Sequence, residues 1–145
     1  MAVPVQVTFD AADPEALGRF WGEVLGYVEQ PPPEGYASWD AFLDSIGAPP
    51  EDRDSTYAVI DPDGVGPRLL FQRVPEGKTA KNRVHLDVDV GAGLDRADRP
   101  ARCRQRVAEL ERLGATQLRV FEGEEGPGSF WIVMADPEGN EFCLQ

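Results

Sequence analysis

The single histidine of the chain lies in a segment in which polar and apolar residues alternate. His85 is followed at every second position by Asp87 and Asp89. The positions between them are apolar: Val84, Leu86, Val88 and Val90. This period of two predicts a half-buried strand with the histidine and both carboxylates on its polar face. Imidazole and carboxylate groups bind divalent metal ions and transfer protons, so this face is the first candidate for chemistry.

The sequence leaves open whether His85 and Asp87 touch. Residues i and i+2 of a strand share a face but lie about 7 Å apart along it. A lone histidine in a strand is also typical of a hydrogen-bonded structural residue. We therefore interpret His85 as a pocket-lining residue and leave a catalytic role open. The two cysteines, Cys103 and Cys143, fall in a predicted helix and a predicted strand, which is typical of buried thiols rather than of a disulfide or a zinc site.

Two tryptophans are candidates for pocket walls. Trp131 alternates in a predicted strand over 130–135, which places it either in the core or on a wall. Trp39 lies in a short predicted helix, capped by Ser38, that follows three prolines at 31–33. Aromatic walls with a few polar groups are typical of small-molecule pockets. The Trp39 helix is therefore our candidate for ligand selectivity, with the cover of a sheet edge as the alternative.

The elements that position these residues occur twice in the same order. An alternating strand begins near Gln6 and near His85. A helix ends in Leu-Gly at 25–26 and at 113–114, and a strand enters an Asp-Pro-acid-Gly turn at 61–64 and at 136–139. We predict two tandem βαβββ modules, over about 3–75 and about 83–145, with a helical insert at about 31–54 in the first. In the second, Cys103, Val107, Leu110 and Leu113 form the predicted helix stripe.

A single module would leave a sheet edge and a sheet face unsatisfied. We therefore expect one α+β domain over 1–145, in which the two modules pair into a half-open, mixed β-sheet barrel with the helices outside. The polar segment at 75–82 is the predicted linker between them.

The first half of the chain resembles one module of the vicinal oxygen chelate superfamily. The resemblance rests on an ordered series of motifs: a strand, then Asp-Pro-Glu, Phe-Trp, Leu-Gly-Tyr and Asp-Pro-Asp-Gly. This superfamily includes glyoxalase I, bleomycin-resistance proteins and extradiol dioxygenases. The closing segment from Trp131 to Cys143 is similar to the glyoxalase-like branch. The resemblance covers nearly the whole chain apart from the insert. It implies the fold rather than one activity, because this fold supports several chemistries as well as pure binders.

Metal-dependent members place one ligand on the first strand and one on the last strand of each module. The resemblance maps these positions onto Gln6, a residue near Gln72, His85 and Cys143. Cys143 replaces a common glutamate, and we place Glu141 on the opposite face of that strand unless a β-bulge turns it inward. Such a set supplies at most one anionic ligand and no general base. We expect no cofactor and a pocket without a functional metal; if a divalent metal binds, the implied ligands are Gln6, Gln72 and His85.

Composition excludes several classes of partner. The formal charge of −12, from 26 acidic and 14 basic side chains, disfavours nucleic acid and anionic lipids. No apolar run approaches the roughly 18 residues of a membrane span, and the first residues lack the pattern of a secretory signal. We expect a cytoplasmic protein that binds neither nucleic acid nor membranes. The family resemblance leaves a homodimer possible.

We predict a glyoxalase-like protein that binds a small organic molecule in a concave pocket. The residues expected to line this pocket are Gln6, Thr8, Trp39, Gln72, His85, Asp87, Trp131 and Cys143. Sequestration of a drug is one version, for which the acidic surface favours a cationic or polyhydroxylated ligand. A metal-dependent lyase, isomerase or dioxygenase and a regulatory module with a vestigial pocket are the alternatives. Whether the chain is an enzyme is left open.

Overall fold

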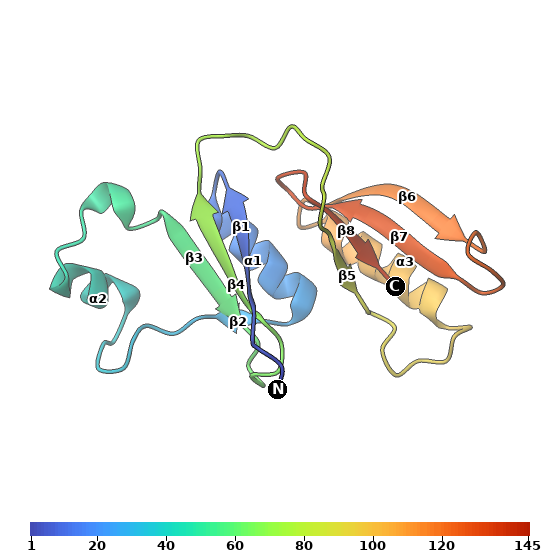
Figure 1. Cartoon of the computed structure of the whole chain (residues 1–145), viewed down its shortest axis with the longest axis horizontal. Helices are drawn as coiled ribbons and strands as arrows, with labels where there is room; N and C mark the ends of the chain where they lie inside the picture. Colours follow the sequence, from blue (N-terminus) through green and yellow to red (C-terminus); the bar gives the residue numbers. More distant parts are fainter. The chain divides into compact units, whose positions relative to one another are not determined.

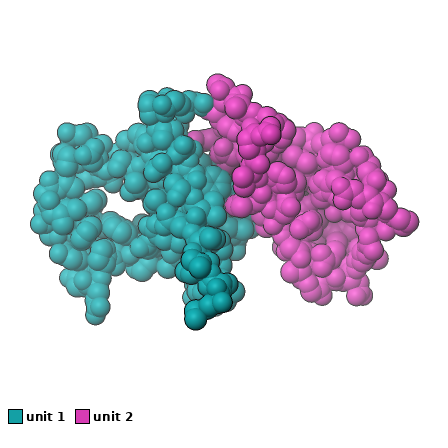
Figure 2. Space-filling view, viewed as in Figure 1, with its two compact units in different colours: residues 1–77 teal, residues 78–145 magenta.

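In the computed structural model, which describes residues 1–145, the same order of elements occurs in two units, Met1–Gly77 and Lys78–Gln145 (Figures 1 and 2). Unit 1 contains β1 (Gln6–Ala11), α1 (Pro14–Leu25), β2 (Val28–Glu29), α2 (Trp39–Ser45), a 3-10 turn (Pro50–Asp52), β3 (Thr56–Ile60) and β4 (Arg68–Arg73). Unit 2 contains β5 (Leu86–Val88), α3 (Arg99–Glu111), β6 (Thr116–Glu122), β7 (Phe130–Ala135) and β8 (Glu141–Leu144). The strand orders are β1-β4-β3-β2 and β5-β8-β7-β6, with the first strand parallel to the last in each unit. The α+β class with two tandem βαβββ modules is confirmed.

Helix α1 of unit 1 forms where the sequence places a cap, a proline and an apolar stripe in succession. The Asp13 carboxylate accepts a hydrogen bond from the Ala16 N–H at 3.0 Å, and Gly26 ends the helix with a φ of 71°. The stripe is buried against one face of the sheet: Leu17, Phe20, Trp21 and Val24 from α1 with Val59, Leu69 and Phe71 from the strands. Each such side chain contributes roughly 1.5–3 kcal/mol through burial.

Helix α3 of unit 2 packs in the same way on its own sheet. Cys103, Val107 and Leu110 are buried on the helix, and Ile132, Met134, Phe142 and Leu144 are fully buried on the strands. The prediction that Leu113 continues the helix stripe is wrong, since its side chain is 46% exposed. The helix ends at Glu111, and Gly114 with a φ of 100° then turns the chain toward β6.

Two strands differ from the expected elements: β2 was not expected, and β5 is shorter than expected. Strand β2 has only two residues, too few to show any alternation, and was not predicted from the sequence. Strand β5 begins at Leu86, so His85 lies just before it, and Val84 is 79% exposed. The short helix of the insert is confirmed as α2, and the Ser38 hydroxyl caps it by accepting from the Ala41 N–H at 3.1 Å. None of the helices has the length and apolar content needed to cross a membrane.

The repeated Asp-Pro-acid-Gly turns are built on one shared interaction, in which the aspartate accepts backbone hydrogen bonds from the residues after it. Asp61 accepts from the N–H groups of Asp63, Val65 and Gly66 at 2.9, 3.0 and 2.7 Å. Asp136, which is only 3% exposed, accepts from the N–H groups of Glu138 and Asn140 at 2.9 Å each. The Asn140 side-chain amide donates to Asp136 as well, at 2.8 Å. These bonds explain why aspartate begins both turns.

We expect Asp136→Ala to lower the free energy of unfolding by about 1–3 kcal/mol, because three donors lose a buried acceptor. Urea denaturation followed by circular dichroism measures this loss. Asp63→Ala in the turn of unit 1 is the matched control, because the exposed Asp63 side chain accepts no hydrogen bond there. Its expected effect is within about 0.5 kcal/mol. Equal losses in the two variants would contradict the role assigned to Asp136.

Candidate functional site

In unit 2 the residues of chemical interest lie on the side of the sheet opposite to α3. Ile132, Met134 and Phe142 are fully buried on the α3 side. The residues that alternate with them therefore point the other way. We call this surface the helix-free face of unit 2; its members are Asp87, Trp131, Val133, Glu141 and Cys143.

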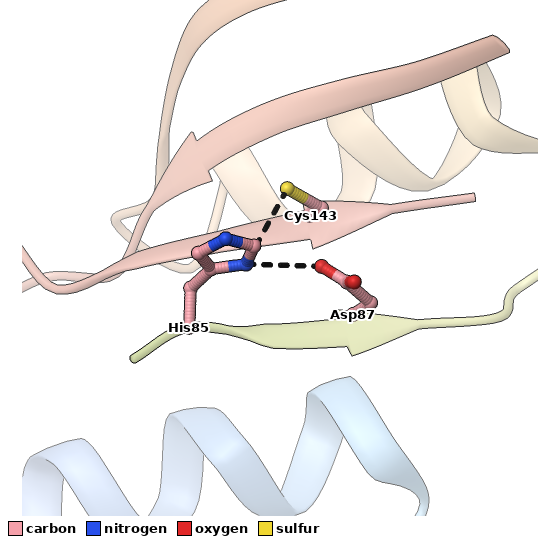
Figure 3. A group of neighbouring side chains, drawn as sticks. All are labelled: His85, Asp87 and Cys143. Atoms are coloured by element: carbon pink, nitrogen blue, oxygen red, sulfur yellow. Dashed lines mark hydrogen bonds and ion pairs between the residues drawn. The ribbon is translucent and has the colours of Figure 1, made fainter. Parts of the chain in front are cut away.

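Three side chains converge on this face (Figure 3). Strands β5 and β8 are parallel neighbours, and their register sets Asp87 opposite Cys143. The ring of His85 turns toward both, with Nδ1 3.0 Å from Asp87 Oδ1 and 4.0 Å from Cys143 Sγ. Because a carboxylate accepts, the hydrogen of this bond is on Nδ1. The contact that the sequence left open exists, because the histidine side chain spans the distance between alternate residues.

The Cys143 thiol stays protonated at neutral pH. Burial is the main cause that raises its pKa to about 11, and the negative charge of Asp87 with its hydrogen bond to the thiol adds to this effect. A thiol with this pKa is ionised in only about one molecule in ten thousand at pH 7. Without a metal ion, Cys143 is therefore a neutral donor to Asp87 rather than a nucleophile.

The same three residues fit a divalent metal ion. Their ligand atoms, one nitrogen, one carboxylate oxygen and one sulfur, all lie within 4.8 Å of one another. The ligand atoms of a tetrahedral zinc site lie about 3.5 Å apart, so small side-chain rotations would bring the three together. A metal ion also displaces the proton of a thiol, which supplies a second anionic ligand. The expectation of at most one anionic ligand is therefore wrong, because it did not count Asp87.

The expectation that Glu141 faces away from Cys143 is also wrong. The two residues are two positions apart in β8, so a regular strand places both on one face, and the fully buried Phe142 between them points to the other. The Glu141 carboxylate forms an ion pair with Lys81. Glu141 is a second carboxylate on the helix-free face of unit 2, outside the cluster of three ligand atoms.

Trp131 lies on the helix-free face of unit 2 and is half-buried. Its ring stacks on Phe121, its partner in the register of β6 and β7, with centroids 4.7 Å apart and planes inclined by 10°. The sequence left open whether the Trp131 side chain lies in the core or on a pocket wall. The structure places it with the polar residues, in a stacked aromatic pair.

In unit 1, the predicted residues Gln6, Thr8 and Gln72 form hydrogen bonds with protein partners. Gln6 accepts from Arg68 at 2.5 Å and donates to Thr8 at 3.2 Å, while Gln72 donates to Asp10 at 2.8 Å. Gln6 is opposite Arg68 and Gln72 is opposite Asp10. Gln6 and Gln72 are therefore four residues apart along the paired strands, or about 13 Å. Ligands of one ion lie much closer, so the implied metal set that joins these two amides is wrong.

Unit 1 contains a pocket of about 370 Å³ at the edge of β3. Strand β2 pairs with Val59 and Ile60, and the Gln30 N–H donates to the Ala58 carbonyl at 3.0 Å, which leaves Thr56 and Tyr57 as a free edge of β3. The insert with α2 lies beyond this edge, and the space-filling view is hollowed there (Figures 1 and 2). The apolar part of the wall comes from both sides: Trp39 and Leu43 from α2, Ala58 from β3 and Leu70 from β4.

The wall that α2 supplies is held by specific contacts. The Trp39 indole N–H donates to the Gln30 carbonyl at 2.8 Å, which fixes the orientation of the ring. At the far end of the insert, Arg53 forms an ion pair with Asp44 at 2.6 Å and donates to the Ala48 carbonyl. Trp39 therefore ties the start of α2 to Gln30, and Arg53 ties the last part of the insert to the end of α2.

Two polar residues of this pocket were not predicted from the sequence. Arg68 donates to the Gln30 side chain at 2.6 Å, and Tyr57 donates to Glu29 at 3.1 Å. Burial first, and then the charge of Glu29, raises the pKa of Tyr57 to about 12, so its hydroxyl remains a donor. Arg68 could have been predicted from the sequence, because the period of two places it on the same face of the predicted strand as Gln72.

The comparison with known proteins assigns this chain to a family. The model of a family described as a glyoxalase-like domain matches residues 6–145. The chain therefore belongs to the glyoxalase-like domain family, within the vicinal oxygen chelate superfamily. No curated protein matches it.

Several solved structures share the fold. An enzyme of the glyoxalase, bleomycin resistance protein and dioxygenase family from Burkholderia phytofirmans PsJN is 18% identical, with a TM-score of 0.59 over 96% of this chain and 94% of its own. The fosfomycin resistance protein FosX from Mesorhizobium loti is 19% identical, with a TM-score of 0.60 over 100% of this chain and 91% of its own. A mutant FosX from Listeria monocytogenes, in complex with Mn(II) and 1S,2S-dihydroxypropylphosphonic acid, is 11% identical, with a TM-score of 0.59 over 100% of this chain and 90% of its own. At these identities the likeness shows the fold alone.

The raised pKa of Cys143 predicts slow alkylation. In a Cys103→Ala background at pH 8, we expect Cys143 to react with iodoacetamide about 100-fold more slowly than an unperturbed thiol, since about two pH units separate their pKa values. The rate should still rise above pH 10. Asp87→Asn should speed the reaction severalfold by lowering the pKa, whereas Asp89→Asn should not. Mass spectrometry follows the modification, and a rate that levels off by pH 9 would contradict the protonated thiol.

Proposed function

We propose that this glyoxalase-like protein binds a small organic molecule in the pocket between β3 and the insert of unit 1. The observation that carries the proposal is the pocket itself. Its volume of about 370 Å³ lies within the range of roughly 300–1,000 Å³ that small-molecule sites occupy. Trp39, Leu43 and Leu70 give it apolar walls, and Arg68 is among the polar groups that converge on it.

The exposure of the insert supports a binding role over simple cover of the β3 edge. No residue of α2 is fully buried, and its apolar side chains Trp39, Phe42 and Leu43 are only half-buried. Ile46 after the helix is 59% exposed. A helix that served only as cover would gain most by burying these side chains against the sheet. Here Trp39 and Leu43 line a space instead.

The pocket predicts ligand-dependent stabilisation that depends on Trp39. In a thermal-shift screen of metabolites and antibiotics, a bound compound at 100 times its dissociation constant adds about 2.7 kcal/mol of stability. We expect Trp39→Ala to abolish the shift of such a compound and Trp39→Phe to retain part of it. Trp131→Ala in unit 2 is the matched control, and the shift should persist in it. A shift that survives Trp39→Ala, or the absence of any stabilising compound, would contradict the proposal.

The cluster of His85, Asp87 and Cys143 favours a second candidate, a metal-dependent lyase, isomerase or dioxygenase of the superfamily. In this alternative the three residues hold the ion and leave one position open for water or substrate. The mutant FosX with Mn(II) shows that a protein of this fold carries such an ion. A bound ion would polarise a substrate oxygen as a Lewis acid.

Metal content separates this second candidate from a pocket that functions without metal. If the candidate is correct, protein purified without chelators will contain stoichiometric Zn, Fe, Mn or Ni by elemental analysis. His85→Ala and Asp87→Asn should each lower the affinity for the ion about tenfold or more. Asp89→Asn is the matched control, because Asp89 pairs with Arg99 at 3.1 Å instead of joining the cluster. Metal-free protein that fails to bind these ions in calorimetry would rule the candidate out.

A further inference from the structure

The pocket between β3 and the insert carries a one-sided charge. Two arginines line it, Arg53 and Arg68. The acidic side chains of the wall are more numerous: Glu15, Glu29, Asp40, Asp52 and Asp54. Because a cleft with apolar walls concentrates the field of its charges, such an imbalance selects among ligands by their charge.

Ion pairs to neighbouring residues reduce this imbalance but do not remove it. Arg19 pairs with Glu15 at 2.7 Å and reaches Glu29 at 4.0 Å, and Arg73 pairs with Asp54 at 2.8 Å. Arg53 of the wall is itself neutralised by Asp44, at 2.6 Å. These partners add two positive charges and one negative charge to the five acids and two arginines of the wall. Two negative charges therefore remain in excess.

The acids without an ion pair are both in the insert. Asp40 follows Trp39 in α2, and Asp52 lies in the 3-10 turn; neither carboxylate has an ion-pair partner. Trp39 and Leu43 lie beside them in the same wall. Carboxylates next to an aromatic ring and an aliphatic side chain provide two attractions for a cation with an apolar body, because the face of an indole also attracts positive charge.

We infer that the occupant of this pocket is an organic cation, namely a molecule with an apolar body and a protonated amine. The inference rests on the proposed function. The apolar body fits the wall of Trp39, Leu43 and Leu70, and the amine fits Asp40 and Asp52. Arg68 does not reverse this selection, because its positive charge is already included in the count that leaves two negative charges in excess. It also donates to the side-chain oxygens of Gln30 and Gln6 at 2.6 and 2.5 Å. Those bonds occupy part of its guanidinium group.

Three probes with the same naphthyl body and a cationic, neutral or anionic end group test the inference: naphthylethylamine, naphthylethanol and naphthylacetate. We expect isothermal titration calorimetry at low salt to show the amine bound about tenfold more tightly than the alcohol and the acetate bound most weakly. The double variant Asp40→Asn, Asp52→Asn should weaken the amine about three- to tenfold and leave the alcohol unchanged. Asp63→Asn is the matched control, because it removes one acid outside the pocket. Circular dichroism confirms that each variant is folded.

The outcomes separate this inference from the proposed function. If the alcohol binds as tightly as the amine, or if the acetate binds best, the cation inference is overturned while binding of an organic molecule stands. If none of the three probes binds but other compounds stabilise the protein through Trp39, the inference is again overturned and the proposed function stands. If no compound binds in either experiment, both fail. Equal weakening by Asp63→Asn would show a general charge effect and would overturn the assignment to Asp40 and Asp52.

Discussion

Each module buries one helix against one face of its sheet, and this one-sided burial determines where the functional side chains lie. In unit 1 the core forms between Trp21 of α1 and Phe71 of β4, and in unit 2 it forms between Leu110 of α3 and Phe142 of β8. Because strand residues alternate, every residue next to a core residue points to the other face. Asp87 and Cys143 lie together for this reason, with no loop needed to hold them. The parallel pairing of first and last strand then fixes their register.

The two modules use the same frame but carry different chemistry on it. In unit 2, the pairing of β5 with β8 sets Asp87 opposite Cys143. In unit 1, the corresponding pairing of β1 with β4 sets Thr8 opposite Leu70. A leucine cannot bind a metal ion, and a threonine hydroxyl is a weak substitute for a carboxylate. Unit 1 instead has a long connection between β2 and β3, which contains α2 and the pocket. The same fold thus carries the cluster of His85, Asp87 and Cys143 in unit 2 and a pocket beside the insert in unit 1.

The sequence predicted those features that depend on near neighbours along the chain. The caps at Asp13 and Ser38 were predictable because the side chain and the N–H group that it binds are three residues apart. The repeat was predictable because alternation and turn residues recur in order. The donor set around His85 was not, because it depends on which residue of β8 lies opposite Asp87, and strand register is a property of the folded sheet. The face on which Glu141 lies was predictable from the period of two alone, because Glu141 and Cys143 are two positions apart in the strand. The expectation that they face opposite sides did not follow that spacing.

The pocket of unit 1 was only half predictable for a related reason. Trp39 and its helix were identifiable, but the space beside them arises because β2 stops after two residues and leaves Thr56 and Tyr57 of β3 unpaired on that side. A free strand edge exposes N–H and C=O groups, so proteins tend to cover it. The insert covers this edge at a distance; Trp39 ties it to Gln30, and the ion pair of Arg53 with Asp44 holds its two halves together. Edge protection and an enclosed space are therefore consequences of the same insertion, and its acidic side chains give that space a charge that the apolar walls alone would lack.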